Sequence, residues 1–62
     1  MDRLLTPAEA AELLGVTEGA LAQWRFRRMG PAYTKLNERA VRYTHAQLEE
    51  WVSLRTINRA PE

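Results

Sequence analysis

The residues of this sequence that have the clearest chemical potential are cations, and they gather in residues 24 to 43, "WRFRRMGPAYTKLNERAVRY". Six cations against one acid give this segment a charge of +5, whereas three cations and seven acids elsewhere give −4. Guanidinium and ammonium groups crowded in this way create a positive potential that attracts a polyanion. The alternative is an ordinary solvated surface with no partner.

Other residue types that could do chemistry are few. His45 is the only histidine, cysteine is absent, and there is no glycine-rich phosphate loop. Glu49 and Glu50 point in different directions from a helix, so they set up no acid/base pair. Glu9 and Glu12 are interpreted as solvated helix charges rather than metal ligands. We therefore expect a protein that is not an enzyme and that has no catalytic residue, no metal and no cofactor.

Size and composition indicate one small intracellular domain. A chain of 62 residues buries only about 60% of the surface that its unfolded form exposes, so its stability is modest. The absence of cysteine fits a reducing cytosol. No apolar run approaches the roughly 18 residues of a membrane span. We expect a soluble cytoplasmic protein that has no membrane contact and, if it binds DNA, associates with the nucleoid.

The elements that must position the cationic segment begin with a short helix. In "LLTPAEAAELLG", Thr6 is a predicted N-cap, Pro7 takes the first helical position, and Glu9 completes a capping box. Gly15 supplies a left-handed stop, so the helix is expected over residues 7–14. The residues expected on its inward side are Ala10, Leu13 and Leu14.

A second helix is predicted directly after this stop. Thr17 is its N-cap, and "EGALAQWRFRR" has apolar residues at helical spacing. Two short helices joined by a turn that contains glycine form a helix-turn-helix. The residues expected on the inward side are Ala20, Leu21, Trp24 and Arg28. Those expected on the outward side are Gly19, Ala22, Gln23 and Phe26.

The outward side of the second helix is the predicted base-reading surface, because a helix-turn-helix places its second helix in the major groove. Gln23 can pair bidentately with adenine, and Ala22 or Phe26 could touch a thymine methyl group. For Phe26 we favour another interpretation, in which it packs beneath the following loop against Tyr33, because aromatic residues are more often buried than exposed.

A hairpin is predicted after "MGP", since "AYTKL" and "AVRYT" are short β-prone runs around the polar turn "NER". Asn37 can take the left-handed conformation that such a turn often needs. Lys35, Arg39 and Arg42 are expected to project from this two-stranded wing, on the same side as the end of the second helix.

A third helix, over residues 45–56, is expected to close the core. Thr44 and Gln47 make another capping pattern at its start. Leu54 and Ile57 fall outside its apolar stripe, and residues 58–62 are predicted to be a frayed tail. The residues expected along the stripe are Leu48, Trp51, Val52 and Arg55.

Four segments of the chain occur in the order and at the spacing of a known family: "LLTPAEAAELLGVT", "LAQWR", "GPAYTKL" and "VRYTHAQLEEW". Across residues 4–52 the chain thus resembles the small MerR-like helix-turn-helix domains of excisionases and related phage or mobile-element regulators. The resemblance implies a winged helix-turn-helix with three helices and a two-stranded wing. It also implies DNA binding without cofactors, often in arrays that bend DNA. Excisionases of this kind direct an integrase toward excision, and other members regulate transcription.

The resemblance also implies roles for individual positions. Base-reading side chains fall near Thr17 to Gly19 and at Ala22 and Gln23, and the wing corresponds to residues 35–42. Phosphate contacts fall on the arginines after Trp24, namely Arg25, Arg27 and Arg28. This chain has Arg28 and Asn37 where the family commonly has glycine, and the acidic Glu38 at the wing tip. Arg28 is therefore expected to impose another way of ending the helix. Ala22, where relatives often carry a larger polar residue, implies fewer base contacts.

We therefore expect a DNA-binding domain over residues 4–57 that binds double-stranded DNA sequence-specifically. The expected role is that of an excisionase that binds and bends attachment-site DNA, with an integrase and further copies of the chain as possible partners. If four to six cations each neutralise a phosphate, log K should fall against log[salt] with a slope of roughly −4 to −5. One alternative is a transcriptional regulator of the same fold. The other is a protein-interaction module that uses Phe26, Leu54 or Ile57.

Overall fold

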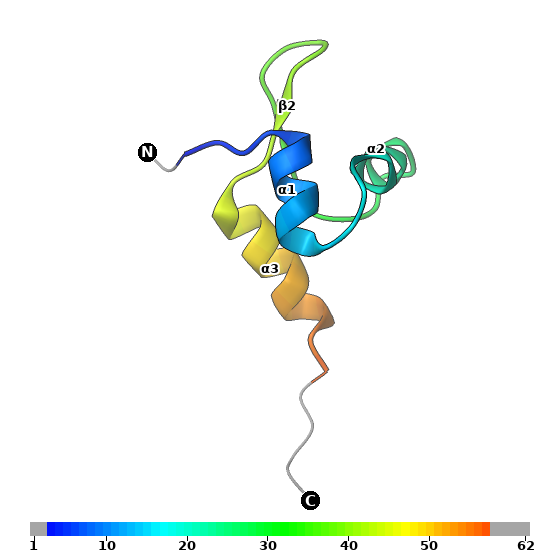
Figure 1. Ribbon diagram of the computed structural model, residues 1–62, viewed down its shortest axis with the longest axis vertical. Helices are drawn as coiled ribbons and strands as arrows, with labels where there is room; N and C mark the ends of the chain where they lie inside the picture. The colour runs from blue at the N-terminus through cyan, green and yellow to red at the C-terminus, as the bar shows by residue number, and fades with distance from the viewer. Residues whose placement is uncertain (1–2, 58–62) are drawn as a thin grey trace, which may run out of the picture.

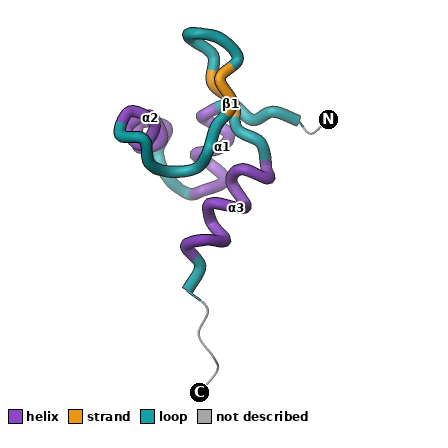
Figure 2. Tube along the Cα trace, turned by 180° about the vertical axis from the view of Figure 1, so that it is seen from behind, coloured by secondary structure: helices purple, strands orange, loops and turns teal. Residues whose placement is uncertain are grey.

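The computed structural model describes residues 3–57 and contains three helices and a two-stranded antiparallel sheet. Along the chain these are α1 (Pro7–Leu14), α2 (Glu18–Phe26), β1 (Thr34–Lys35), β2 (Val41–Arg42) and α3 (His45–Arg55). Helices α1 and α3 form the body of the domain, and the hairpin extends from one end of this body (Figure 1). Helix α2 lies beside the body. The view from behind shows the same arrangement (Figure 2). The predicted fold class, mainly helical with a small hairpin, is confirmed. The tail predicted for residues 58–62 lies outside the described residues.

Side-chain caps determine where the helices begin. At α1, the Thr6 hydroxyl accepts from the Glu9 N–H at 3.1 Å, and the Glu9 carboxylate accepts from the Thr6 N–H at 2.9 Å. Thr44 and Gln47 make the same reciprocal pair at α3, with distances of 3.0 and 2.9 Å. Such pairs satisfy backbone donors that a helix start leaves free. Both predicted capping boxes are therefore confirmed.

The core lies where the three helices meet the base of the hairpin. Its buried members are Leu5, Ala10, Ala11, Leu21, Tyr43 and Leu48. Leu5 and Tyr43 also exchange backbone hydrogen bonds of 2.7 and 2.9 Å, so the segment before α1 lies alongside the end of the hairpin. The Gln47 amide donates to the Thr34 hydroxyl at 3.3 Å and links α3 to β1.

Two apolar residues predicted on inward faces are exposed, and Arg55, which was predicted on the stripe of α3, is exposed as well. Leu13 is 59% exposed, and Val52 is 44% exposed. The buried residues of α1 are instead Ala10 and Ala11, and α1 packs against α2. Leu13 and Val52 instead line an open groove between α1 and α3.

A second packing centre joins α2 to α3 through two tryptophans. The rings of Trp24 and Trp51 have centroids 5.1 Å apart, and the Arg55 guanidinium lies 4.3 Å from the Trp51 ring. Gly30 packs directly on Trp24. A Cβ atom at Gly30 would lie only 2.9 Å from Trp24 Cβ, and Gly30 has a left-handed φ of 85°. Glycine is therefore required here both by the backbone and by the available space.

Candidate nucleic-acid interface

The outward side of α2 presents polar and small side chains that the fold does not use for packing. Gly19, Ala22, Gln23 and Arg27 are all exposed, as predicted for the first three. Ala22, Gln23, Phe26 and Arg27 line a shallow hollow on this side. Residues three and four positions apart share a helix face, so this surface can meet a partner as one unit.

The start of α2 leaves room for a close approach. The Thr17 hydroxyl accepts from the Ala20 N–H at 3.0 Å, so Thr17 holds the first turn in place. A Cβ atom at Gly19 would find nothing nearer than this hydroxyl, at 3.9 Å, and Gly19 has no left-handed φ. Packing and backbone geometry therefore do not require glycine here, although glycine inside a helix costs roughly 0.5–1 kcal/mol relative to alanine. A need for backbone proximity to a partner would account for it.

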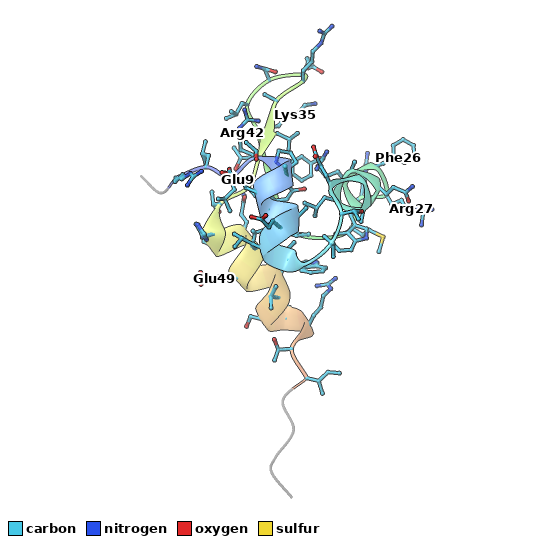
Figure 3. The ribbon with its side chains drawn as sticks, viewed as in Figure 1. Glu9, Phe26, Arg27, Lys35, Arg42 and Glu49 are labelled. Atoms are coloured by element: carbon cyan, nitrogen blue, oxygen red, sulfur yellow. The ribbon has the colours of Figure 1, made fainter. Side chains whose placement is uncertain are left out.

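Phe26 is exposed, and the favoured prediction that it packs against Tyr33 is wrong. Its side chain is 89% exposed, and it points away from α1 and α3 (Figure 3). The reason is helical geometry: Trp24 points inward to Trp51, and two residues further along a helix the side chain has turned by about 200°. Tyr33 instead packs near Tyr43, with ring centroids 6.2 Å apart.

Arg25 connects α2 to the base of the hairpin. Its Nη1 donates to the Tyr43 hydroxyl at 3.0 Å, and its guanidinium lies 5.9 Å from the Tyr33 ring centroid. Tyr43 is completely buried and Arg25 is half-buried. This contact was not predicted from the sequence. Its only signal there is that aromatic residues alternate with arginines in residues 24–27. Arg25 is therefore placed to hold α2 against the hairpin.

Arg28 ends α2 in the way that a glycine would. Its φ is 59°, its N–H donates to the Arg25 carbonyl at 3.1 Å, and the Met29 N–H donates to the Trp24 carbonyl at 2.7 Å. These two bonds form a Schellman motif, in which the left-handed position usually belongs to glycine. The prediction that Arg28 imposes another helix ending is therefore wrong, as is its placement on the inward side of α2, because its side chain is exposed.

The left-handed Arg28 predicts that Arg28→Gly stabilises the domain. A side chain in this conformation costs roughly 1–2 kcal/mol, and glycine removes most of that cost. We expect the free energy of unfolding to rise by about 1 kcal/mol in a urea titration. Arg28→Ala is the matched control, since it removes the same cation and keeps the strained conformation. Equal stability of the two variants would contradict the explanation.

The hairpin presents two exposed cations, Lys35 and Arg39. Lys35 Nζ lies 3.7 Å from the Glu38 carboxylate, which is an exposed ion pair of little energetic weight. Asn37 does not use the left-handed conformation that is open to it. Its side-chain oxygen instead accepts from the N–H groups of Arg39 at 2.8 Å and Ala40 at 3.0 Å. The amide thus supports the turn together with backbone hydrogen bonds between Asn37 and Ala40, without a left-handed residue.

Arg42 lies at the base of the hairpin, facing α1. It is half-buried, its Nη1 donates to the Val41 carbonyl at 2.8 Å, and it lies near Glu9 (Figure 3). The hydrogen bond from the Thr6 backbone lowers the pKa of Glu9, and the charges of Arg3 and Arg42 lower it further. Arg42 thus has an internal role that Lys35 and Arg39 do not share.

The structure therefore separates the predicted site residues into two groups. One group is exposed: Thr17, Gly19, Ala22, Gln23, Arg27 and Arg28 on or beside α2, and Lys35, Asn37 and Arg39 on the hairpin. The other group, Arg25 and Arg42, is half-buried and bonded within the protein. No helix in residues 3–57 is long and apolar enough to cross a membrane.

Two helices joined by a tight turn, a third helix and an adjoining hairpin define the class of small winged helix-turn-helix domains, whose second helix is exposed for recognition. The chain belongs to the helix-turn-helix domain family, because the sequence model of that family matches residues 4–56. Membership indicates DNA binding. No curated protein and no solved structure matches the chain significantly.

Proposed function

We propose that this protein binds double-stranded DNA sequence-specifically, with α2 in the major groove and the hairpin along the flanking backbone. The observation that carries the proposal is the outward side of α2. It offers an amide, small side chains and a cation that make no contact needed for folding. The proposal gives the protein no catalytic role.

Base reading is assigned to the first two turns of α2. Gln23 presents a side-chain amide that can bond bidentately to adenine. Gly19 has no side chain and Ala22 has only a methyl group, so the helix can lie close to the base edges. Thr17 acts indirectly, because its hydroxyl is engaged in capping the helix.

Phosphate binding is assigned to the exposed cations, and the half-buried ones are given a positioning role. Arg27 and Arg28 lie at the end of α2, and Lys35 and Arg39 lie on the hairpin. Arginine and lysine contacts of this kind fix the register of a protein on DNA. The weak pair between Lys35 and Glu38 exchanges readily for a phosphate. Arg25 holds the two parts of the surface together.

Replacing Arg27 and replacing Gln23 should have different consequences. We expect Arg27→Ala to weaken binding to all sequences about equally and to reduce the salt slope by about 1. We expect Gln23→Ala to relax the preference at one base position, at a cost of about 1–3 kcal/mol for the preferred base. Selection of binding sites from a random library measures both. An unchanged selection profile for Gln23→Ala would contradict the placement of α2.

Within DNA-binding proteins, we propose an excisionase that binds attachment-site DNA in the nucleoid and directs an integrase toward excision. The resemblance of residues 4–52 to that group supports this role. A single module of this size has a limited contact area, roughly 600–1,000 Å², so tight selectivity requires neighbouring copies or DNA bending. Cooperative assembly on the DNA is therefore part of the proposal.

A gel-shift titration on two DNA fragments tests the excisionase role. One fragment carries the attachment site nearest the gene, and the other carries the promoter of the gene itself. Stepwise, cooperative shifts on the attachment site are the expected result. A single shift confined to the promoter would indicate a transcriptional regulator instead. No shift on either fragment would favour a protein-interaction module.

A further inference from the structure

Phe26 is the most exposed of the large hydrophobic side chains in residues 3–57, at 89%. It cannot be explained by the core, because it points away from Trp24 and Trp51. It also does not belong to a larger apolar patch. Its neighbours in the hollow on α2 are Ala22, Gln23 and Arg27, and none of these is a large apolar side chain.

The surroundings of Phe26 favour a base edge over a protein surface. A docking patch for a protein would need several contiguous apolar side chains, whereas Phe26 stands between an amide and a guanidinium. The major-groove edge of an A·T pair has a matching composition: a methyl group next to hydrogen-bonding atoms, with phosphates close by. The inference rests on the proposed placement of α2 in the major groove.

We propose that Phe26 reads the 5-methyl group of a thymine. Phe26 follows Gln23 by three residues, so the two side chains share a face and lie about 4.5 Å apart along the helix axis. Base pairs follow one another every 3.4 Å. The thymine read by Phe26 therefore lies within one or two base pairs of the adenine read by Gln23.

Replacing thymine with deoxyuracil tests this contact, because the exchange removes only the 5-methyl group. Each thymine of a selected binding site is replaced in turn, and the dissociation constants of the wild-type protein and of Phe26→Ala are measured. The wild type should lose about fourfold in affinity at one position, the value expected for one buried methyl group. Phe26→Ala should lose nothing there. Phe26→Leu, which keeps an apolar side chain, should retain part of the sensitivity.

Controls separate this proposal from the proposed function and from folding. Phe26 is exposed, so Phe26→Ala should unfold at the wild-type temperature. Ala22→Gly removes the other candidate methyl contact and should leave the deoxyuracil effect in place. The proposal is overturned if no thymine is sensitive, or if Phe26→Ala keeps the sensitivity. In either case, salt-dependent binding that Arg27→Ala weakens would show that the DNA-binding function itself still stands.

Discussion

Raising the salt concentration from about 50 mM to about 200 mM is expected to weaken DNA binding by about a hundredfold. Each cation that neutralises a phosphate contributes about 0.9 to the slope of log K against log[salt]. Four cations of the basic segment are exposed: Arg27, Arg28, Lys35 and Arg39. Together they give a slope of about −3 to −4, which is shallower than the sequence alone predicts. Fluorescence anisotropy on a labelled duplex at several salt concentrations measures it.

Two single substitutions test the salt slope: one removes a proposed phosphate contact, and the other is its matched control. Arg39→Gln should reduce the slope by about 0.9, because it removes one proposed phosphate contact. Arg3→Gln removes an exposed cation that pairs with Glu9, outside the basic segment, and should leave the slope unchanged. A flat response would remove the phosphate-binding explanation. A slope near −5 would instead indicate that Arg25 and Arg42 also contact phosphates.

Gly30→Ala is expected to destabilise the domain by about 2–5 kcal/mol. Its Cβ would lie 2.9 Å from Trp24 Cβ, and both the backbone and the tryptophan pair would have to shift. Overpacking of this kind costs about 1–3 kcal/mol, and a left-handed alanine adds roughly 1–2 kcal/mol. For a domain of this size the melting temperature should fall by more than about 10 °C, as differential scanning calorimetry would show.

The other two glycines separate the causes of this loss. Gly15 has a φ of 74° but no atom within 4 Å of an added Cβ, so Gly15→Ala isolates the backbone cost of roughly 1–2 kcal/mol. Gly19 has neither constraint, and Gly19→Ala should stabilise α2 by roughly 0.5–1 kcal/mol. If Gly30→Ala cost no more than Gly15→Ala, the contact with Trp24 would not be limiting.

Local signals predicted the helix boundaries well. Thr6, Pro7 and Gly15 fix both ends of α1, and the expected range 7–14 is the observed one. Thr44 and Gln47 fix the start of α3 equally well. Caps act within a few residues of the chain, so their effect can be recognised without knowledge of the tertiary structure.

Errors arose where a distant part of the chain decides the outcome. Leu13 belongs to the apolar pattern of α1, but the sequence does not show that α1 packs on the side of Ala10 and Ala11. Phe26 is apolar and is exposed because Trp24 takes the inward direction. Arg28 and Asn37 show a different limit: each turn can be made in more than one backbone conformation, and the residue type alone does not say which one is adopted. The division of the candidate site into exposed and half-buried cations was therefore not predicted from the sequence.

The contact of Arg25 with Tyr43 and Tyr33 has a consequence for the DNA. Tyr43 is fixed by burial and by its backbone pairing with Leu5, and its bond from Arg25 ties α2 to the base of the hairpin. A duplex bound across both elements, as proposed, would then have to adjust its groove width to their spacing. The energy of that adjustment is smallest at flexible pyrimidine–purine steps. The protein would therefore select such steps at positions that none of its side chains touches.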